Sequence, residues 1–189
     1  MAADDADARE EVHEEAAAPE PPRDEVAAAL LERFPDTVFV DSHGQAVVHV
    51  PREQWHDVAA FLRDEQQFTQ CVDVTSVDQL VAPARALPDA VTAERFEVVA
   101  NYLSHVRNRR IRVIAQVPAD DPTVASLTDL YRGVNFAERE TYDLFGIEFT
   151  GHPDLTRILM PDDWVGYPLR KDDAPARVPV TFKGDPSPR

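Results

Sequence analysis

Two glutamates and one histidine are the side chains whose types could perform acid–base chemistry. Glu138 and Glu140 could act as an acid/base pair, and His152 stands between Gly151 and Pro153, which restrict the backbone around it. Residues two apart on a helix diverge by about 200°, so the two glutamates do not share a target. We interpret them as a solvated or salt-bridged helix turn and His152 as a hydrogen-bonded turn residue at an interface. A free-standing hydrolase that uses His152 with Glu138 or Glu140 is the remote alternative.

Metal and cofactor motifs are missing from the sequence. His43 and His49 could approach each other across a hairpin, but no carboxylate or cysteine stands at ligand spacing around them. The single cysteine, Cys71, excludes an internal disulfide and a cysteine-only metal cluster, and we interpret it as core packing. The six glycines form no phosphate-binding loop, and there is no nucleophile elbow. We expect no catalytic residue, metal or cofactor in this chain.

The net charge of −16 argues against binding to nucleic acid or to an anionic membrane, since both require a basic surface. Half of this charge lies in the first 25 residues, where ten acidic residues face Arg9 and Arg23. The only basic cluster is Arg107, Arg109, Arg110 and Arg112. Either a charged solvent face or contact with an acidic partner would explain that cluster.

The N-terminal residues 1-24 lack the apolar residues that would offset the entropy of ordering them, and we predict a disordered acidic tail. This stretch is not a signal peptide, because it has no basic region followed by an apolar one. No run approaches the roughly 18 apolar residues of a spanning helix. Any membrane contact is therefore expected only through partners.

A short helix must position the two glutamates. Residues 135–144 suit it, with Asn135 as the N-cap and Gly146 ending it. Arg139 and Asp143 are four residues apart, as are Glu138 and Tyr142, so an ion pair and a carboxylate–phenol contact could form along the helix.

An irregular segment follows this helix. A short strand is predicted at 147–149, a turn at 151–154 and a second extended piece at 155–160. Beyond residue 160 the apolar residues Trp164, Tyr167 and Leu169 follow no regular period. An extended arm with exposed apolar groups needs a partner surface.

The remaining elements complete an α+β pattern. Helices are predicted at 25–34, 52–66 and 123–131, strands at 37–41, 46–50, 68–77, 96–103 and 110–117, and an inserted loop at 81–92. Strands that mix with helices without strict alternation favour a mostly antiparallel four- to five-stranded sheet with helices packed on it. We predict three parts: the tail at 1-24, an α+β domain at 25-150 and an extended partner-binding arm at 151-189.

The segment from Glu138 to Asp173 resembles the 30-kDa subunit of respiratory complex I, the NADH-quinone oxidoreductase. The shared residues are Glu138-Arg139-Glu140, Tyr142-Asp143-Leu144-Phe145-Gly146-Ile147, Gly151-His152-Pro153-Asp154-Leu155, Arg157-Ile158-Leu159 and Gly166-Tyr167-Pro168-Leu169-Arg170-Lys171-Asp172. The similarity extends over roughly residues 25 to 175. Tyr167 stands where the family often has histidine, so a pH-linked role for that position is not expected.

The resemblance implies a scaffold subunit without a redox centre in the peripheral arm of a proton-translocating NADH:quinone oxidoreductase. It implies docking on the quinone-site subunit and neighbouring iron–sulfur subunits, with FMN and the clusters in those partners, at the cytoplasmic face of a bacterial membrane. Trp164, Tyr167 and Leu169 would bury apolar area, while Arg157, Arg170 and Lys171 would pair with partner acids. The full expected interface is Glu138, Arg139, Glu140, Asp143, Gly146, Gly151, His152, Pro153, Arg157, Trp164, Tyr167, Leu169, Arg170, Lys171 and Asp172. A membrane-bound hydrogenase or a quinone dehydrogenase with another electron donor is the alternative assembly.

Overall fold

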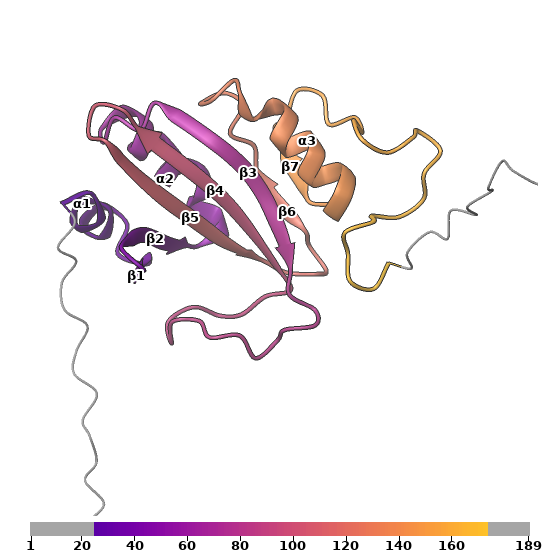
Figure 1. The fold of residues 1–189 in the computed structure, drawn as a ribbon, viewed down its shortest axis with the longest axis horizontal. Coiled ribbons are helices and arrows are strands. Elements are labelled where there is room, and N and C mark those ends of the chain that lie inside the picture. Colours follow the sequence, from indigo (N-terminus) through magenta and orange to yellow (C-terminus); the bar gives the residue numbers. More distant parts are fainter. Residues whose placement is uncertain (1–24, 174–189) are drawn as a thin grey trace, which may run out of the picture.

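A five-stranded mixed sheet forms the centre of the molecule, with three helices around it (Figure 1). The computed structural model describes residues 25–173, so the predicted tail and the part of the predicted arm at 174–189 lie outside the described residues. The strand order in the sheet is β1-β2-β5-β4-β3, and two short strands, β6 and β7, form a second sheet. The predicted α+β class with a mostly antiparallel sheet is confirmed.

The element bounds follow most of the predicted ranges closely, and the exceptions are the ranges 123–131 and 155–160. In chain order they are α1 Glu25–Arg33, β1 Val38–Ser42, β2 Gln45–Val50, a 3-10 turn Arg52–Gln54, α2 Trp55–Asp64, β3 Gln70–Asp78, β4 Phe96–Ser104, β5 Arg109–Val117, β6 Thr123–Ala125, α3 Val134–Phe145 and β7 Glu148–Thr150.

The predicted hairpin is present between β1 and β2. Ser42 pairs with Gln45, and the two turn residues, His43 and Gly44, have φ angles of 54° and 79°. Two left-handed residues give the turn a twist that matches the twist of the strands. The Gly44 N–H donates to Asp41 Oδ1 at 2.7 Å, which closes the turn.

The core lies between the large sheet and α2. Trp55, Val58 and Leu62 of α2 are fully buried, as their three- and four-residue spacing predicts. They belong to one cluster with buried strand residues such as Val48 and Val113. β2 pairs in parallel with β5, and the other pairs of this sheet are antiparallel. Chain reversal through α2 makes that parallel pair possible.

The prediction of a helix at 123–131 is wrong. Thr123 and Val124 lie in β6, which pairs in parallel with β7 at Val124 and Phe149. The Ser126 N–H continues the ladder to Thr150 O at 2.9 Å. β-branched residues favour a strand where a partner strand is present, and β7 supplies that partner only in the tertiary structure.

Two smaller predictions around α3 are also wrong. The helix begins at Val134 with Gly133 as its N-cap, so Asn135 is inside the helix. No strand forms at 155–160 in the described chain, because three backbone N–H groups of this segment bind a side chain instead of a ladder. The C-cap at Gly146 is confirmed, with a φ of 70°. In the described residues no helix is long and apolar enough to cross a bilayer.

Candidate functional site

The predicted interface residues lie on α3 and on residues 151–173, which we call the arm. The arm runs beside α3 (Figure 1), and the Leu169 N–H donates to Leu144 O of that helix at 3.1 Å. The described arm is irregular, as predicted, but it is folded against its own domain. Whether these residues contact a partner stays a prediction.

Asp143 fixes the first half of the arm. Its side chain is fully buried, and its Oδ2 accepts the N–H groups of Ile158, Leu159 and Met160 at 3.0, 2.7 and 2.8 Å. Its Oδ1 accepts Arg157 Nη1 at 3.0 Å. Burial alone would raise the pKa of Asp143, but these donors outweigh burial and hold the pKa below its usual value. The carboxylate therefore stays ionised and holds three consecutive backbone groups.

The predicted ion pair between Arg139 and Asp143 is wrong. Arg139 instead donates to the backbone O and to Oγ1 of Thr156, at 2.9 and 2.8 Å. Arg157 also binds within the chain, since its Nη2 donates to Gly166 O at 3.0 Å in addition to the Asp143 bond. The arm places fixed donors and acceptors over α3, and these displace the simple pairing along the helix. Arg157 has an internal carboxylate partner, and its expected pairing with a partner's acid stays a prediction.

Glu138 lies in the core, which corrects the prediction of a solvated turn. Its side chain is fully buried, Oε2 accepts Ser126 Oγ at 2.6 Å, and Oε1 accepts the Leu127 N–H at 2.7 Å. Burial raises the pKa of Glu138 to about 7, against the effect of these two hydrogen bonds. Glu140, two residues further on, is exposed as predicted. The two carboxyl groups point to different environments, as the helix geometry requires.

His152 lies beside Glu138, and its side chain is also buried. Its Nδ1 accepts the Asp154 N–H at 3.0 Å, so a neutral ring carries its proton on Nε2. Nε2 lies 3.3 Å from Asn135 O and 4.0 Å from Glu138 Oε2. The predicted hydrogen-bonded turn histidine is confirmed. The side chains of His152 and Glu138 are both fully buried, so a substrate cannot reach them, and the geometry gives no support to a hydrolase.

Gly146 lets the arm approach the end of α3. A Cβ at this position would lie 2.6 Å from the Tyr167 ring and 2.6 Å from Arg170 Nη2. Arg170 donates to Phe145 O at 2.5 Å and to Gly146 O at 3.2 Å, and its guanidinium lies 4.5 Å from the Tyr167 ring centroid. Arg170 thus binds the free carbonyls at the helix C-terminus. Like Arg157, it has partners within the chain.

A second buried carboxylate fixes the far end of the arm. Asp78 accepts the Lys171 N–H at 2.8 Å and forms an ion pair with Arg95 at 2.9 Å. Arg95 also pairs with Asp172. Burial opposes ionisation of Asp78, but the bonds to Arg95, Lys171 and Leu80 lower its pKa. Sequence reasoning missed Asp78 and Arg95, because an aspartate at the end of a strand gives no signal that a residue far along the chain will bind it.

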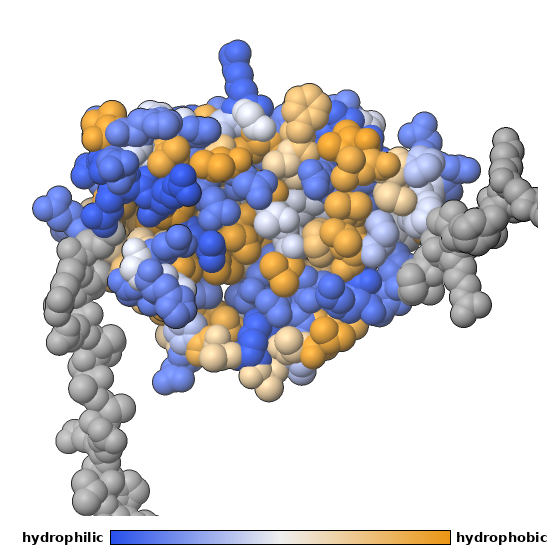
Figure 2. Space-filling model, viewed as in Figure 1, coloured by the Kyte–Doolittle hydropathy of each residue, from blue (hydrophilic) through white to orange (hydrophobic). Residues whose placement is uncertain are grey.

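The outer surface of α3 and the arm exposes large apolar side chains among polar ones (Figure 2). The exposed fractions are 66% for Phe136, 57% for Leu159, 92% for Val165 and 43% for Leu169. Trp164 and Tyr167, predicted to be exposed, are half-buried against the domain. Exposed apolar groups of this size on a rigid support are typical of a protein interface.

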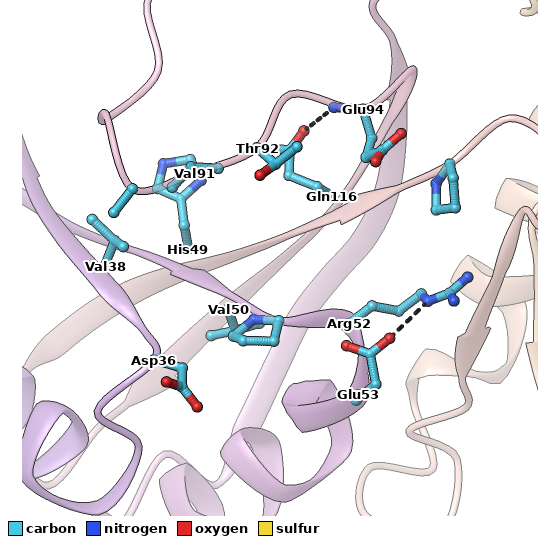
Figure 3. Close-up of a pocket in the computed structure, with 13 residues that line it drawn as sticks. Asp36, Val38, His49, Val50, Arg52, Glu53, Val91, Thr92, Glu94 and Gln116 are labelled. Carbon is cyan, nitrogen blue, oxygen red and sulfur yellow. Dashed lines mark hydrogen bonds and ion pairs between the residues drawn. The ribbon is translucent and has the colours of Figure 1, made fainter.

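A pocket of about 410 Å³ lies elsewhere, between the end of β2 and the loop at 90–94 (Figure 3). His49 lines it, and burial lowers the pKa of His49. His49 pairs with Val38 at the opposite end of β2 from His43, so the expected approach of the two histidines is wrong. Arg52 also lines the pocket, and its Nη1 donates to Asp121 Oδ2 at 2.9 Å. None of the predicted interface residues lines this pocket.

The chain matches the family model described as "Respiratory-chain NADH dehydrogenase, 30 Kd subunit" over residues 48–178. The match covers β2 to β5, α3 and the arm. A relative from Salinispora arenicola, named as a subunit of NADH-quinone oxidoreductase, is 43% identical over 169 residues, which are 85% of this chain and 65% of the relative. The chain therefore spans slightly less than two thirds of the length of that relative.

Two solved structures share the fold. One is titled "Nqo5 of the trypsin-resistant fragment (1-134)"; it is 35% identical, has a TM-score of 0.59, and the match covers 69% of this chain and 99% of that one. The other comes from an archaeal respiratory membrane complex, the membrane-bound sulfane sulfur reductase, with a TM-score of 0.62, 20% identity, and coverage of 86% and 94%. At that identity the second likeness concerns the fold alone.

Proposed function

Because the chain belongs to the family of 30-kDa subunits of respiratory-chain NADH dehydrogenase, we propose that it is a scaffold subunit of a proton-translocating NADH:quinone oxidoreductase. In this role it docks on the quinone-site subunit in the peripheral arm of the complex. It supports electron transfer from NADH to quinone by holding other subunits in place. Its contribution is positional, and the redox chemistry takes place in those subunits.

The observation that carries this proposal is that buried carboxylates fix the surface formed by α3 and the arm. Asp143 and Asp78 each bind arm backbone groups from a buried position, Asp143 in the first half of the arm and Asp78 at its far end. Buried, multiply bonded carboxylates hold a loop in one conformation, so the exposed Leu159 and Val165 are presented on a rigid frame. A preorganised surface loses little conformational entropy when a partner binds, which favours a permanent interface.

The proposed partners are the quinone-site subunit and neighbouring iron–sulfur subunits, and FMN and the clusters belong to them. The proposed location is the cytoplasmic face of a bacterial membrane, held there by partners. Docking through α3 and the arm differs from the expected list of contacts at the residues that bind within the chain. The buried Glu138, Asp143 and His152, together with Arg157 and Arg170, act from behind the surface. The exposed apolar residues of the arm, with Phe136 and Glu140, make the contact.

The direct experiment is purification of the intact assembly from the native membrane through a tag on this chain. Mass spectrometry then identifies the subunits, and NADH:quinone activity is assayed on the same preparation. Copurification of the quinone-site subunit with flavin- and cluster-bearing subunits, together with NADH:quinone activity, is the expected result. A chain recovered alone would contradict the proposal.

The alternative assembly is a membrane-bound hydrogenase or a dehydrogenase with another electron donor. A chain of an archaeal sulfane sulfur reductase complex shares this fold, so the fold by itself does not distinguish the two assemblies. The same purification separates the two, because hydrogenase or other donor subunits would replace the flavin subunit and NADH would not reduce quinone. In either case the surface of α3 and the arm keeps its docking role.

A further inference from the structure

Positive charge is concentrated at one end of the large sheet, around the turn between β4 and β5. Arg107 lies in the turn, and Arg109, Arg110 and Arg112 lie in the first half of β5. Arg109 and Arg110 are exposed, and Arg107 and Arg112 are half-buried. We call this group the basic turn. It stands out because the chain as a whole carries a net charge of −16.

The basic turn presents charge on both faces of the sheet. Ile111 is buried in the core, so its neighbours Arg110 and Arg112 project from the opposite face, which is turned away from α2 (Figure 1). Arg107 Nε donates to Gln66 O at 3.0 Å, just beyond the end of α2, and therefore lies on the helix side. Acidic groups could therefore approach this end of the molecule from either face.

A hollow of about 340 Å³ adjoins the outer part of the basic turn. Arg110, Arg112 and Asn101 line it, together with Val72 and Asp73. Arg112 Nε donates to Asn101 Oδ1 at 3.2 Å, which orients the guanidinium. Val72 lies at the bulge of β3 and is 54% exposed. The hollow has a net positive charge, because two guanidinium groups and only one carboxylate, that of Asp73, line it. A guanidinium group binds a carboxylate through paired hydrogen bonds.

Several other arginines are paired with carboxylates of the described chain. These ion pairs are Arg52 with Asp121, Arg63 with Asp64, Arg85 with Glu97, Arg95 with Asp78 and Arg157 with Asp143. Residues 1–24, by contrast, contain nine acidic residues and two arginines, a net charge of −7. The largest block of negative charge in the sequence and the basic turn are therefore complementary.

The attachment point of residues 1–24 lies within reach of the basic turn. The segment joins α1 at Glu25, and the ring of Phe34, next to the end of α1, lies 5.7 Å from that of Phe61 in α2. The end of α2 in turn contacts Arg107. An extended chain covers about 3.3 Å per residue, so 24 residues span the domain, and tethering keeps their concentration near the turn at about the millimolar level.

We propose that the acidic segment of residues 1–24 docks on the basic turn of its own chain, with its carboxylates at Arg110 and Arg112. The segment then covers the strongly positive surface that residues 25–173 present in an otherwise acidic protein. An acidic partner that needs this surface must displace it. Because surface charges are screened beyond about 8 Å at physiological salt, the contact is dynamic and weakens as salt is added.

Paramagnetic relaxation in the full-length chain tests this proposal. A nitroxide is attached through Ala17→Cys, and burial, which raises the pKa of Cys71 to about 12, keeps the native thiol from competing. In about 50 mM salt we expect the amide signals of residues 109–112 and of Val72 to lose most of their intensity, and in about 500 mM salt to recover it. Arg110→Glu should restore most of the lost intensity.

Arg132→Glu is the matched control, because it makes the same charge change at another exposed arginine and should leave the broadening in place. Arg110 has been chosen over Arg112 so that the bond to Asn101 and the fold are kept. Absence of broadening at the basic turn, or broadening that survives both high salt and Arg110→Glu, would overturn the proposal. Broadening of an unlabelled ¹⁵N chain by a labelled ¹⁴N chain in a mixture would also overturn it, since the contact would then join two molecules.

Discussion

Two buried carboxyl groups on one helix, Glu138 and Asp143, have opposite ionisation behaviour. Asp143 accepts three N–H groups and an arginine, and its pKa is lowered. Glu138 accepts one N–H and one hydroxyl, and burial raises its pKa to about 7. The difference follows from the number and charge of the donors, since both side chains are fully buried.

Glu138→Gln should remove a pH-dependent loss of stability. The folded-state pKa of about 7 lies above the ordinary 4.5, so the folded chain binds this proton more tightly and stability falls as pH rises between those values. Relative to the wild type, the variant should gain about 2 kcal/mol of unfolding free energy on going from pH 5.5 to pH 8. Urea unfolding at both pH values measures it.

The variant must be compared with the wild type because His49 also makes the unfolding free energy depend on pH. The pKa of His49 is lowered, so its contribution to stability rises with pH over the same pH range. Glu140→Gln is the matched control, since it makes the same change at an exposed position of the same helix and should leave the pH dependence as it is. Equal pH profiles for the wild type and Glu138→Gln would show that Glu138 ionises normally.

Asp143→Asn should loosen the arm. The amide cannot accept three N–H groups and also compensate the charge of Arg157, so we expect a loss of about 3 kcal/mol. Hydrogen exchange of the amides of Ile158, Leu159 and Met160 should accelerate. Asp162→Asn, an exposed change within the arm, should leave their protection unchanged. Unchanged protection in the Asp143 variant would contradict the anchoring role.

At the scale of elements, the junction between α3 and the arm depends on one glycine. Gly146 has a left-handed φ of 70° and leaves no space for a Cβ under Tyr167 and Arg170. The helix therefore ends where the arm crosses its last turn, and Arg170 binds the last carbonyls. Glycine is therefore required here both by the backbone conformation and by the close packing of the arm.

Gly146→Ala should destabilise the chain more than Gly44→Ala. Gly44 has a φ of 79° but open space around it, so alanine there adds only the left-handed strain of about 1 to 2 kcal/mol. At Gly146 the displacement of Tyr167 and Arg170 is added, and we expect about 3 kcal/mol or more. Urea unfolding measures the unfolding free energy of both variants. Equal losses of unfolding free energy would mean that Tyr167 and Arg170 do not pack closely against Gly146.

At the scale of the whole molecule, the internal bonds of the arm leave two of its apolar side chains exposed, where the proposed partner would contact them. Val165 is 92% exposed and Leu159 57% exposed, on a segment whose polar groups are bound to the domain. The large sheet and α2 supply the stable body that carries this surface. The division of roles suits a scaffold protein, in which the core gives stability and one edge gives the contact.

Val165→Asp should weaken assembly without unfolding the chain. An exposed substitution changes the unfolding free energy by less than about 0.5 kcal/mol, whereas a carboxylate placed in an apolar interface is costly to desolvate. Val81→Asp, at a 74% exposed valine in the loop between β3 and β4, is the matched control. Affinity purification of tagged variants, with partner subunits quantified, measures the effect. Equal recovery for both variants would move the interface away from the arm.

The sequence by itself determined most elements, because local patterns specify them. The spacing of Trp55, Val58 and Leu62 predicts α2, and the turn at Gly44 predicts the hairpin. The motif from Glu138 to Asp172 identified the family, and it points to the side of the molecule where we propose the site. These features depend on neighbours in sequence, or on a resemblance carried by the residues themselves.

Only the tertiary structure decided which charged groups meet. Thr123 and Val124 form a strand because β7 lies beside them, and Glu138 is buried because Ser126 and Leu127 supply its donors. Asp78 binds Lys171, which lies 93 residues further along the chain. Residue types and spacing do not encode such partners, because a carboxylate gains or loses its proton according to the donors and the burial that long-range packing provides.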